Sequence, residues 1–136
     1  MSWEAFDHTG DIGILVRAPS LETLFEEAAA ALFSILADSS AVRPLEEEEI
    51  EVRGESKDTL LREWLAELLY KFSAEARIYV EFRVAIEPGC VRARVRGERY
   101  SPQRHPLRTE LKAVTYHQLE VTREHDEWRA RVIFDV

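Results

Sequence analysis

The sequence is short of several features that mark whole classes of protein. Its one cysteine, Cys90, cannot form an internal disulfide, which fits a reducing compartment. No apolar run approaches the roughly 20 residues of a membrane-spanning helix, and residues 1–11 lack the basic and apolar regions of a signal peptide. We therefore expect a cytoplasmic protein that has no disulfide, no membrane segment and no export signal.

Glycine-rich and metal-binding motifs are also missing. The five glycines form neither of the common phosphate-binding loops, GxxxxGK[ST] and GxGxxG, so the sequence shows no nucleotide-binding loop of its own. The four histidines are scattered and lie far from Cys90 in the chain. A structural zinc site and a Cys–His nucleophile therefore both have little support.

The charge balance is acidic. Lys and Arg total 18 against 26 Asp and Glu, which gives a net charge of −8 and a pI near 5.1. Such a charge repels phosphate backbones at long range and argues against general nucleic-acid binding by a basic surface. With 136 residues, of which 46% are hydrophobic, we expect a single domain over residues 1–136 with a core of its own.

Two amphipathic helices are predicted from apolar residues at helical spacing. Ser20 is a plausible N-cap for a helix that ends near residues 38–40, and Ser56 can cap a second helix that reaches Phe72. The buried face of the first consists of Leu21, Leu24, Phe25, Ala28, Leu32, Phe33 and Leu36. That of the second consists of Leu60, Leu61, Trp64, Leu65, Leu68, Leu69 and Phe72.

Strands account for most of the remaining chain. They are expected at residues 3–6, 12–18, 50–53, 78–86, 91–95 and 128–136, and the fifth carries arginines on a solvent-exposed face. The acidic run Glu46–Glu49 is interpreted as a solvated entry to the third strand. Residues 110–121 favour a strand, although a helical turn at 112–117 is the alternative. The order predicts an α+β fold in which two amphipathic helices pack on a mainly antiparallel or mixed β-sheet.

Three aspartates are the first candidates for chemistry. Asp11 ends a polar turn, Asp38 ends the first helix, and Asp135 interrupts an apolar strand end. Each can be explained as a turn or exposed residue, and their spacing alone does not show that they meet. If they do converge, their carboxylates would need a cation such as Ca²⁺ or Mg²⁺, which prefer oxygen ligands.

His8 and Lys112 are the other candidates. A lone histidine in a turn more often forms local hydrogen bonds than it catalyses a reaction. Lys112 is one of three lysines, and it is either a solvated side chain or a mobile cation that pairs with carboxylates or with a partner's phosphate.

Several segments together resemble the archease family. Residues 7–13 (DHTGDIG) resemble its (E/D)HTADIG signature, with Gly10 where the family usually has Ala. The similarity continues in order along the chain and ends at Asp135 and Val136, where the family typically has (I/L)DI. The further matching segments are residues 21–29 (LETLFEEAA), 37–39 (ADS), 64–70 (WLAELLY) and 110–117 (ELKAVTYH).

The resemblance implies a protein cofactor with no catalytic activity of its own. Archeases activate RtcB-type RNA ligases in tRNA splicing and RNA repair, promote ligase guanylylation and repeated turnover, and have been proposed to be chaperones. The family's metal site corresponds to Asp11, Asp38 and Asp135, its activity-linked lysine to Lys112, and its signature histidine to His8. We expect a divalent metal ion, Ca or Mg, as cofactor and no stable nucleic-acid binding. A general chaperone and a small metal-dependent hydrolase are the alternatives.

Overall fold

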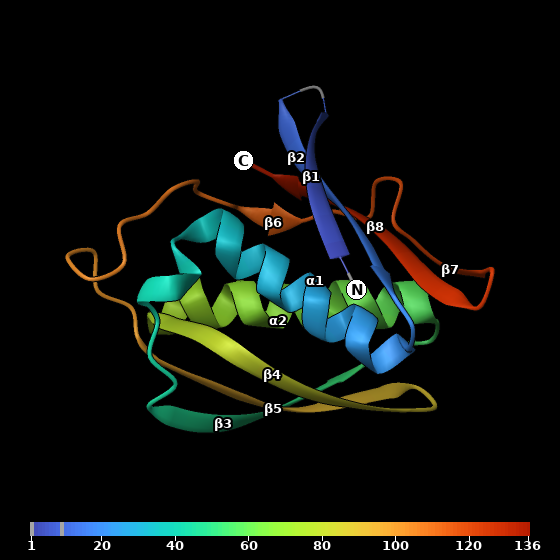
Figure 1. Cartoon of the computed structure of the whole chain (residues 1–136), viewed down its shortest axis with the longest axis horizontal. Helices are drawn as coiled ribbons and strands as arrows, with labels where there is room; N and C mark the ends of the chain where they lie inside the picture. The colour runs from blue at the N-terminus through green and yellow to red at the C-terminus, as the bar shows by residue number, and fades with distance from the viewer. Residues whose placement is uncertain (1, 9) are drawn as a thin grey trace.

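Two antiparallel β-sheets enclose a pair of helices in the computed structural model, which describes residues 2–8 and 10–136, without the side chains of residues 2 and 8 (Figure 1). The five-stranded sheet has the order β1–β2–β8–β6, with β7 also paired to β8, and the three-stranded sheet has the order β3–β5–β4. The first sheet comprises β1 (Ser2–His8), β2 (Asp11–Ala18), β6 (Ala113–Val114), β7 (Glu120–Glu124) and β8 (Glu127–Asp135). The second comprises β3 (Glu46–Arg53), β4 (Arg77–Glu87) and β5 (Cys90–Arg99).

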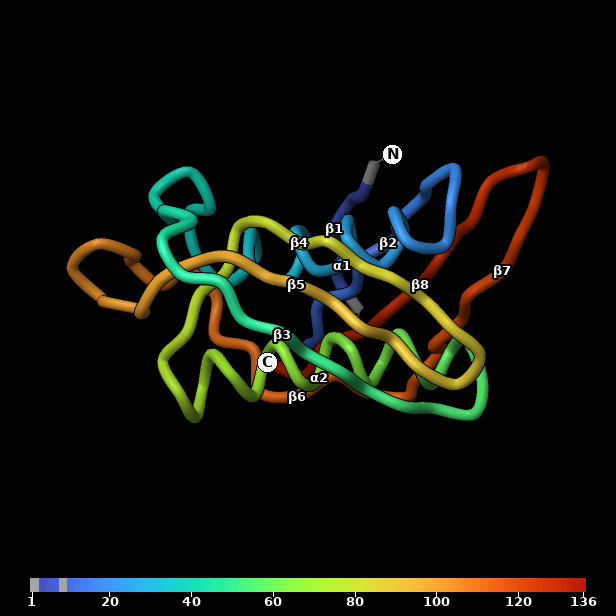
Figure 2. Tube along the Cα trace, turned by 90° about the horizontal axis from the view of Figure 1, so that it is seen from below, coloured from blue at the N-terminus to red at the C-terminus, as the bar shows by residue number. Residues whose placement is uncertain are grey.

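The helices form the middle layer. They are α1 (Leu21–Leu36), capped by Ser20, and α2 (Lys57–Glu75), capped by Ser56. Seen from below, the three-stranded sheet crosses in front of them (Figure 2). Helix α1 packs against β2 of one sheet and β4 of the other, and the indole N–H of Trp64 in α2 donates to the Phe25 carbonyl of α1 at 3.0 Å. Neither helix of the described chain is long and apolar enough to cross a membrane.

The α+β prediction is confirmed, and the structure adds that the strands divide into two sheets. The reason lies in α1, whose buried residues cover more than half of its circumference, which is wider than one sheet can cover. They are Leu24, Phe25, Ala28, Ala29, Ala31, Leu32, Phe33 and Leu36.

The structure corrects one prediction and settles one alternative. The acidic run Glu46–Glu49 is not an entry to β3 but its first half, because each glutamate lies opposite a residue of β5. Residues 110–121 contain no helix; they form the short strand β6, a turn and the start of β7. A short 3-10 helix, η1 (Ser39–Ala41), follows α1 and is capped by Asp38.

Gly97 in β5 lies where the backbone of β4 comes closest. A Cβ added there would overlap the Ile78 carbonyl oxygen and stand 2.6 Å from Tyr79 Cα, beside the irregular pairing of Tyr79 and Glu81. We expect Gly97→Ala to lower the free energy of unfolding by about 2–3 kcal/mol, because both obstacles are backbone atoms of a paired strand. Urea unfolding measures this loss.

Gly13→Ala is the matched control. An added Cβ there meets only the ring of Phe6, which lies on the edge strand β1 and is partly exposed, so the ring can turn aside. A loss below about 1 kcal/mol is expected. Equal losses for the two variants would contradict the backbone clash at Gly97.

Candidate functional site

One end of the five-stranded sheet brings together three of the predicted residues. Asp11 opens β2 and Asp135 closes β8, each one step beyond the paired residues Ile12 and Phe134. The Lys112 backbone N–H donates to the Asp135 carbonyl at 2.7 Å. Asp11 is far from the other two residues in the sequence, and the antiparallel register of β2 and β8 places all three at the same end of the sheet.

The two aspartates lie on the outer face of this sheet. Ile14 and Phe134 are fully buried toward the helices. Because side chains alternate along a strand, Asp11 and Asp135 belong to the opposite face. Asp11 is half-buried and Asp135 is exposed, so both carboxylates remain accessible.

Asp38 lies just beyond α1, on the helix side of the sheet, in a turn of its own. Its Oδ1 accepts hydrogen bonds from the Ser40 hydroxyl at 2.7 Å and the Ser40 backbone N–H at 3.0 Å. Arg108 Nη2 lies 3.8 Å from the same oxygen. The two hydrogen bonds from Ser40, with a smaller contribution from Arg108, lower the pKa of Asp38, so it is ionised at neutral pH.

The loop that carries Arg108 is held against the end of α1. Ala37 pairs with Leu107, and the Arg108 N–H donates to the Leu36 carbonyl at 2.8 Å. Arg108 and Asp7 line a hollow of about 350 Å³, together with Ala5, Phe6, Ile12, Ser34, Ile35 and Thr109. Sequence reasoning missed Arg108, because this pairing joins segments about 70 residues apart and leaves no periodic pattern.

The remaining candidates can be placed only in part. His8 ends β1 opposite Asp11, but its side chain lies outside the described residues. Lys112 is exposed, and no carboxylate among the described side chains lies within ion-pair distance of it. The described residues contain no group of three or more Asp, Glu, His or Cys side chains close enough to hold a metal ion. The structure thus brings Asp11, Asp135 and Lys112 to one sheet end and leaves Asp38 beside Arg108.

A buried ion cluster fixes the loops next to Asp38. Glu98, 5% exposed, accepts from the Arg43 backbone N–H at 2.9 Å, from the Arg43 guanidinium at 2.9 and 3.0 Å and from Arg104 at 3.2 Å. His105 is fully buried; its Nδ1 accepts from the Ser101 N–H at 3.0 Å, so its Nε2 carries the proton and donates to Glu98 at 2.8 Å. The cluster joins the segment after η1 to the 101–108 loop.

The pKa of Glu98 shows the balance within this cluster. Burial by itself raises the pKa of the carboxyl, but the hydrogen bonds from Arg43, His105 and Arg104 outweigh it and lower the pKa from 4.5 to about 2. Glu98 is therefore ionised in the folded protein at neutral and mildly acidic pH.

Two antiparallel sheets around two helices define a small α+β protein, and this chain places two aspartates at one sheet end. The Archease protein family model matches residues 3–136. Protein archease from Methanopyrus kandleri is 41% identical over 140 residues, covering 100% of both chains, and that from Pyrococcus furiosus is 36% identical over 139 residues, covering 98% of both. The chain belongs to the archease family.

Solved structures share the fold. The solution structure of protein 1598 from Methanobacterium thermoautotrophicum matches with a TM-score of 0.86 and 35% identity, covering 98% of both chains. An archease from Thermotoga maritima, described as a possible chaperone, matches with a TM-score of 0.68 and 24% identity, covering 98% of this chain and 96% of that one. At that identity the second match supports the fold alone.

Replacing the central carboxylate of the buried cluster should weaken the fold in a pH-dependent way. Glu98→Gln is expected to lower the free energy of unfolding by about 2 kcal/mol at pH 7, because it leaves Arg43 and Arg104 without their shared anion. The folded-state pKa is depressed, so the contribution of Glu98 is complete above pH 4.5 and is lost as the pH falls toward about 2. Urea unfolding from pH 7 to pH 2.5 should show the two proteins converging.

Glu55→Gln, at an exposed position, is the control and should stay within about 0.5 kcal/mol of the unmodified protein throughout. A difference between Glu98→Gln and the unmodified protein that persists unchanged from pH 5 to pH 2.5 would contradict the assignment.

Proposed function

We propose that this chain is a non-enzymatic cofactor that activates an RtcB-type RNA ligase, promoting its guanylylation and repeated turnover in tRNA splicing and RNA repair. The observation that carries the proposal is the meeting of Asp11, Asp135 and Lys112 at one end of the five-stranded sheet. These residues come from three separate segments that resemble the family's motifs, in a chain that matches the family over its whole length.

The aspartates are proposed to hold a divalent metal ion, either calcium or magnesium. Carboxylate oxygens are the donors that such hard cations prefer, and Mg²⁺ usually keeps several waters while binding one or two carboxylates. Asp11 and Asp135, which lie next to the paired residues Ile12 and Phe134 and share the outer face, fit this requirement, and the ionised Asp38 is the third candidate. The described side chains do not already form a cluster of three, so water or the partner would complete the coordination. When bound, the ion would supply positive charge for phosphate oxygens.

Lys112 is proposed to orient the negative groups at this end of the sheet. Its backbone is bonded to Asp135, and its exposed ammonium has no carboxylate within ion-pair distance among the described side chains. It is therefore available to a carboxylate or phosphate that the ligase presents. His8 stays a candidate beside these residues, because its side chain lies outside the described residues.

The ligase is the proposed partner, and stable direct binding of nucleic acid is not part of the proposal. A chain with a net charge of −8 repels RNA but is attracted to the basic cleft in which a ligase holds RNA. Carboxylates at the sheet end would enter such a cleft as substitutes for phosphate.

A general chaperone is the second candidate, favoured by the description of the Thermotoga maritima archease as a possible chaperone. A chaperone of unfolded chains needs a continuous exposed apolar surface. The exposed large apolar side chains among the described residues lie on separate segments: Leu15, Leu45, Tyr70, Leu107 and Tyr116. Their places on separate segments give the chaperone no support beyond that description.

Neutralising either aspartate at the sheet end should strongly reduce activation without unfolding the protein. Asp11→Asn and Asp135→Asn are each expected to reduce the stimulated rate of ligase guanylylation at least about ten-fold, because each removes a hard-cation ligand. The assay uses purified ligase, GTP and Mg²⁺ or Ca²⁺, with circular dichroism to confirm folding.

Asp126→Asn is the matched control. It makes the same charge change in the β7–β8 turn, at the opposite end of β8, and its φ of 62° suits asparagine. Full stimulation by Asp11→Asn and Asp135→Asn would disprove the proposed role, and loss of stimulation by Asp126→Asn would show that net charge alone matters.

Docking through charge should depend on salt. Because attraction between exposed charges is screened over about 8 Å at physiological ionic strength, the concentration for half-maximal stimulation should rise several-fold between about 50 and 300 mM NaCl. Titrating this protein into the guanylylation assay at each salt concentration measures the shift, and basal ligase activity at the same salt is the control. A half-maximal concentration that does not change with salt would contradict the electrostatic docking.

A further inference from the structure

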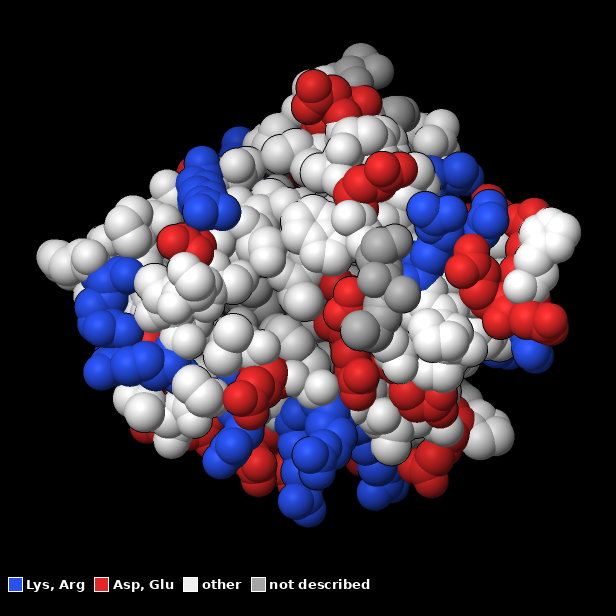
Figure 3. All heavy atoms as spheres, viewed as in Figure 1, with Lys and Arg blue, Asp and Glu red and all other residues white. Residues whose placement is uncertain are grey.

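The outer face of the three-stranded sheet carries rows of charged side chains, away from the proposed ligase-binding end. Along its lower margin, basic and acidic side chains alternate (Figure 3). The β3–β5 register sets a glutamate of β3 opposite three exposed arginines of β5: Glu47 opposite Arg96, Glu49 opposite Arg94, and Glu51 opposite Arg92.

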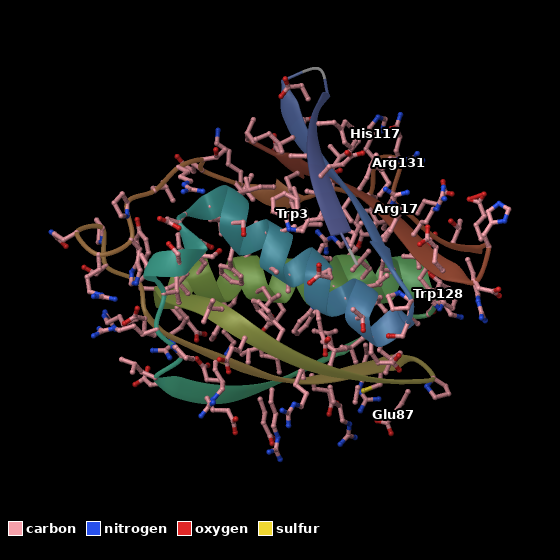
Figure 4. The ribbon with its side chains drawn as sticks, viewed as in Figure 1. Trp3, Arg17, Glu87, His117, Trp128 and Arg131 are labelled. Carbon is pink, nitrogen blue, oxygen red and sulfur yellow. The ribbon has the colours of Figure 1, made fainter. Side chains whose placement is uncertain are left out.

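Two of these arginines are balanced by carboxylates on both sides. Arg92 lies 3.5 Å from Glu51 and 3.1 Å from Glu87, which is one of the residues labelled in Figure 4. Arg96 has the same arrangement, with carboxylates of β3 and β4 at 3.7 and 3.5 Å. Opposite charges facing each other across strands stabilise a sheet, so these two rows need no ligand.

The middle row is different because it has an excess of positive charge. Arg94 lies opposite Glu49 on one side, at 3.6 Å, but opposite Arg83 of β4 on the other. Arg83 is exposed, and it has no ion pair or side-chain hydrogen bond with any described residue. Like charges directly opposite each other in a sheet are destabilising.

The surface is hollowed on both sides of this pair. One hollow of about 540 Å³ is lined by Arg83, Arg92 and Arg94 with Glu49 and Glu51. Another of about 490 Å³ is lined by Arg83, Arg94 and Arg96 with Glu47 and Glu81. Arg83 and Arg94 border both hollows. A small anion can therefore reach the two guanidinium groups from either side.

We propose that Arg83 and Arg94 bind a compact phosphate group, either free phosphate or the monoester of a small molecule. One guanidinium group saturates the two oxygens of a carboxylate, whereas a phosphate monoester has three terminal oxygens and can accept from two arginines at once. The carboxylates of Glu47, Glu51 and Glu81 in the neighbouring rows would repel an extended polyanion. The site therefore suits a single phosphate and disfavours an RNA backbone.

The first experiment titrates the folded protein with sodium phosphate at constant ionic strength and follows backbone amide and arginine Nε–H signals by NMR. Saturable shifts centred on Arg83 and Arg94 are expected. Arg83→Gln should raise the Kd about five-fold or more, and Glu49→Gln should lower it about two-fold by removing the competing carboxylate.

Arg53→Gln is the matched control, because it removes one positive charge from the same sheet at a position that lines neither hollow. Its Kd should change less than about two-fold. Without phosphate, Arg83→Gln should be at least as stable as the unmodified protein, since it relieves the repulsion. A loss of stability would indicate a structural ion pair and overturn the proposal.

The source of the phosphate is tested with uridine 5′-monophosphate and with an RNA oligonucleotide that lacks a terminal phosphate. Tighter binding of the monophosphate than of inorganic phosphate indicates a monoester ligand, and equal binding indicates free phosphate. Shifts that sodium chloride reproduces, or stronger binding of the unphosphorylated oligonucleotide, would overturn the compact site. The outcome is independent of ligase activation, which is measured separately and depends on the other sheet.

Discussion

The burial of α1 between the two sheets is the constraint on which the rest of the structure depends. Its alanines allow close approach, its Leu and Phe side chains fill the space between two sheets, and the Trp64 indole binds its Phe25 carbonyl. Each sheet must turn one face toward the helices, so most of the opposite face of each is left to solvent, apart from buried positions such as Ile133. Residues that bind a partner or ligand can therefore lie on the outer faces or at the ends of the two sheets. Both proposed sites are in these positions.

The ends of the middle layer depend on the cluster around Glu98. The segment after η1 and the 101–108 loop have little regular structure, and hydrogen bonds to one buried carboxylate join them. Asp38 precedes the first of these segments and Arg108 ends the second, at an ion-pair distance of 3.8 Å. Hydrogen bonds to Glu98, rather than pairing between long strands, therefore hold this part of the candidate site in place.

Local patterns in the sequence predict the elements well and their assembly poorly. The serine caps and apolar spacing of α1 and α2, and the alternation in β4 and β5, depend on neighbouring residues and are visible in one segment. The division into two sheets depends on which strands pair, and nothing local encodes the approach of Leu107 to Ala37. The three aspartates were candidates from their positions in the sequence, and only the family resemblance assigned them to a metal site, which stays a prediction. Arg83 and Arg108 were missed because their significance depends on partners distant in the chain.

The acidic run Glu46–Glu49 shows why net charge is a weak guide to surfaces. In the sequence it is the densest block of negative charge, yet in the structure Glu47 and Glu49 face Arg96 and Arg94, and Glu48 pairs with Arg77 and Lys71. This sheet therefore offers a basic partner little unbalanced negative charge, and its central row is locally positive. The aspartates at the end of the other sheet have fewer compensating cations. A basic cleft would distinguish the two faces by local charge, although the chain as a whole carries −8.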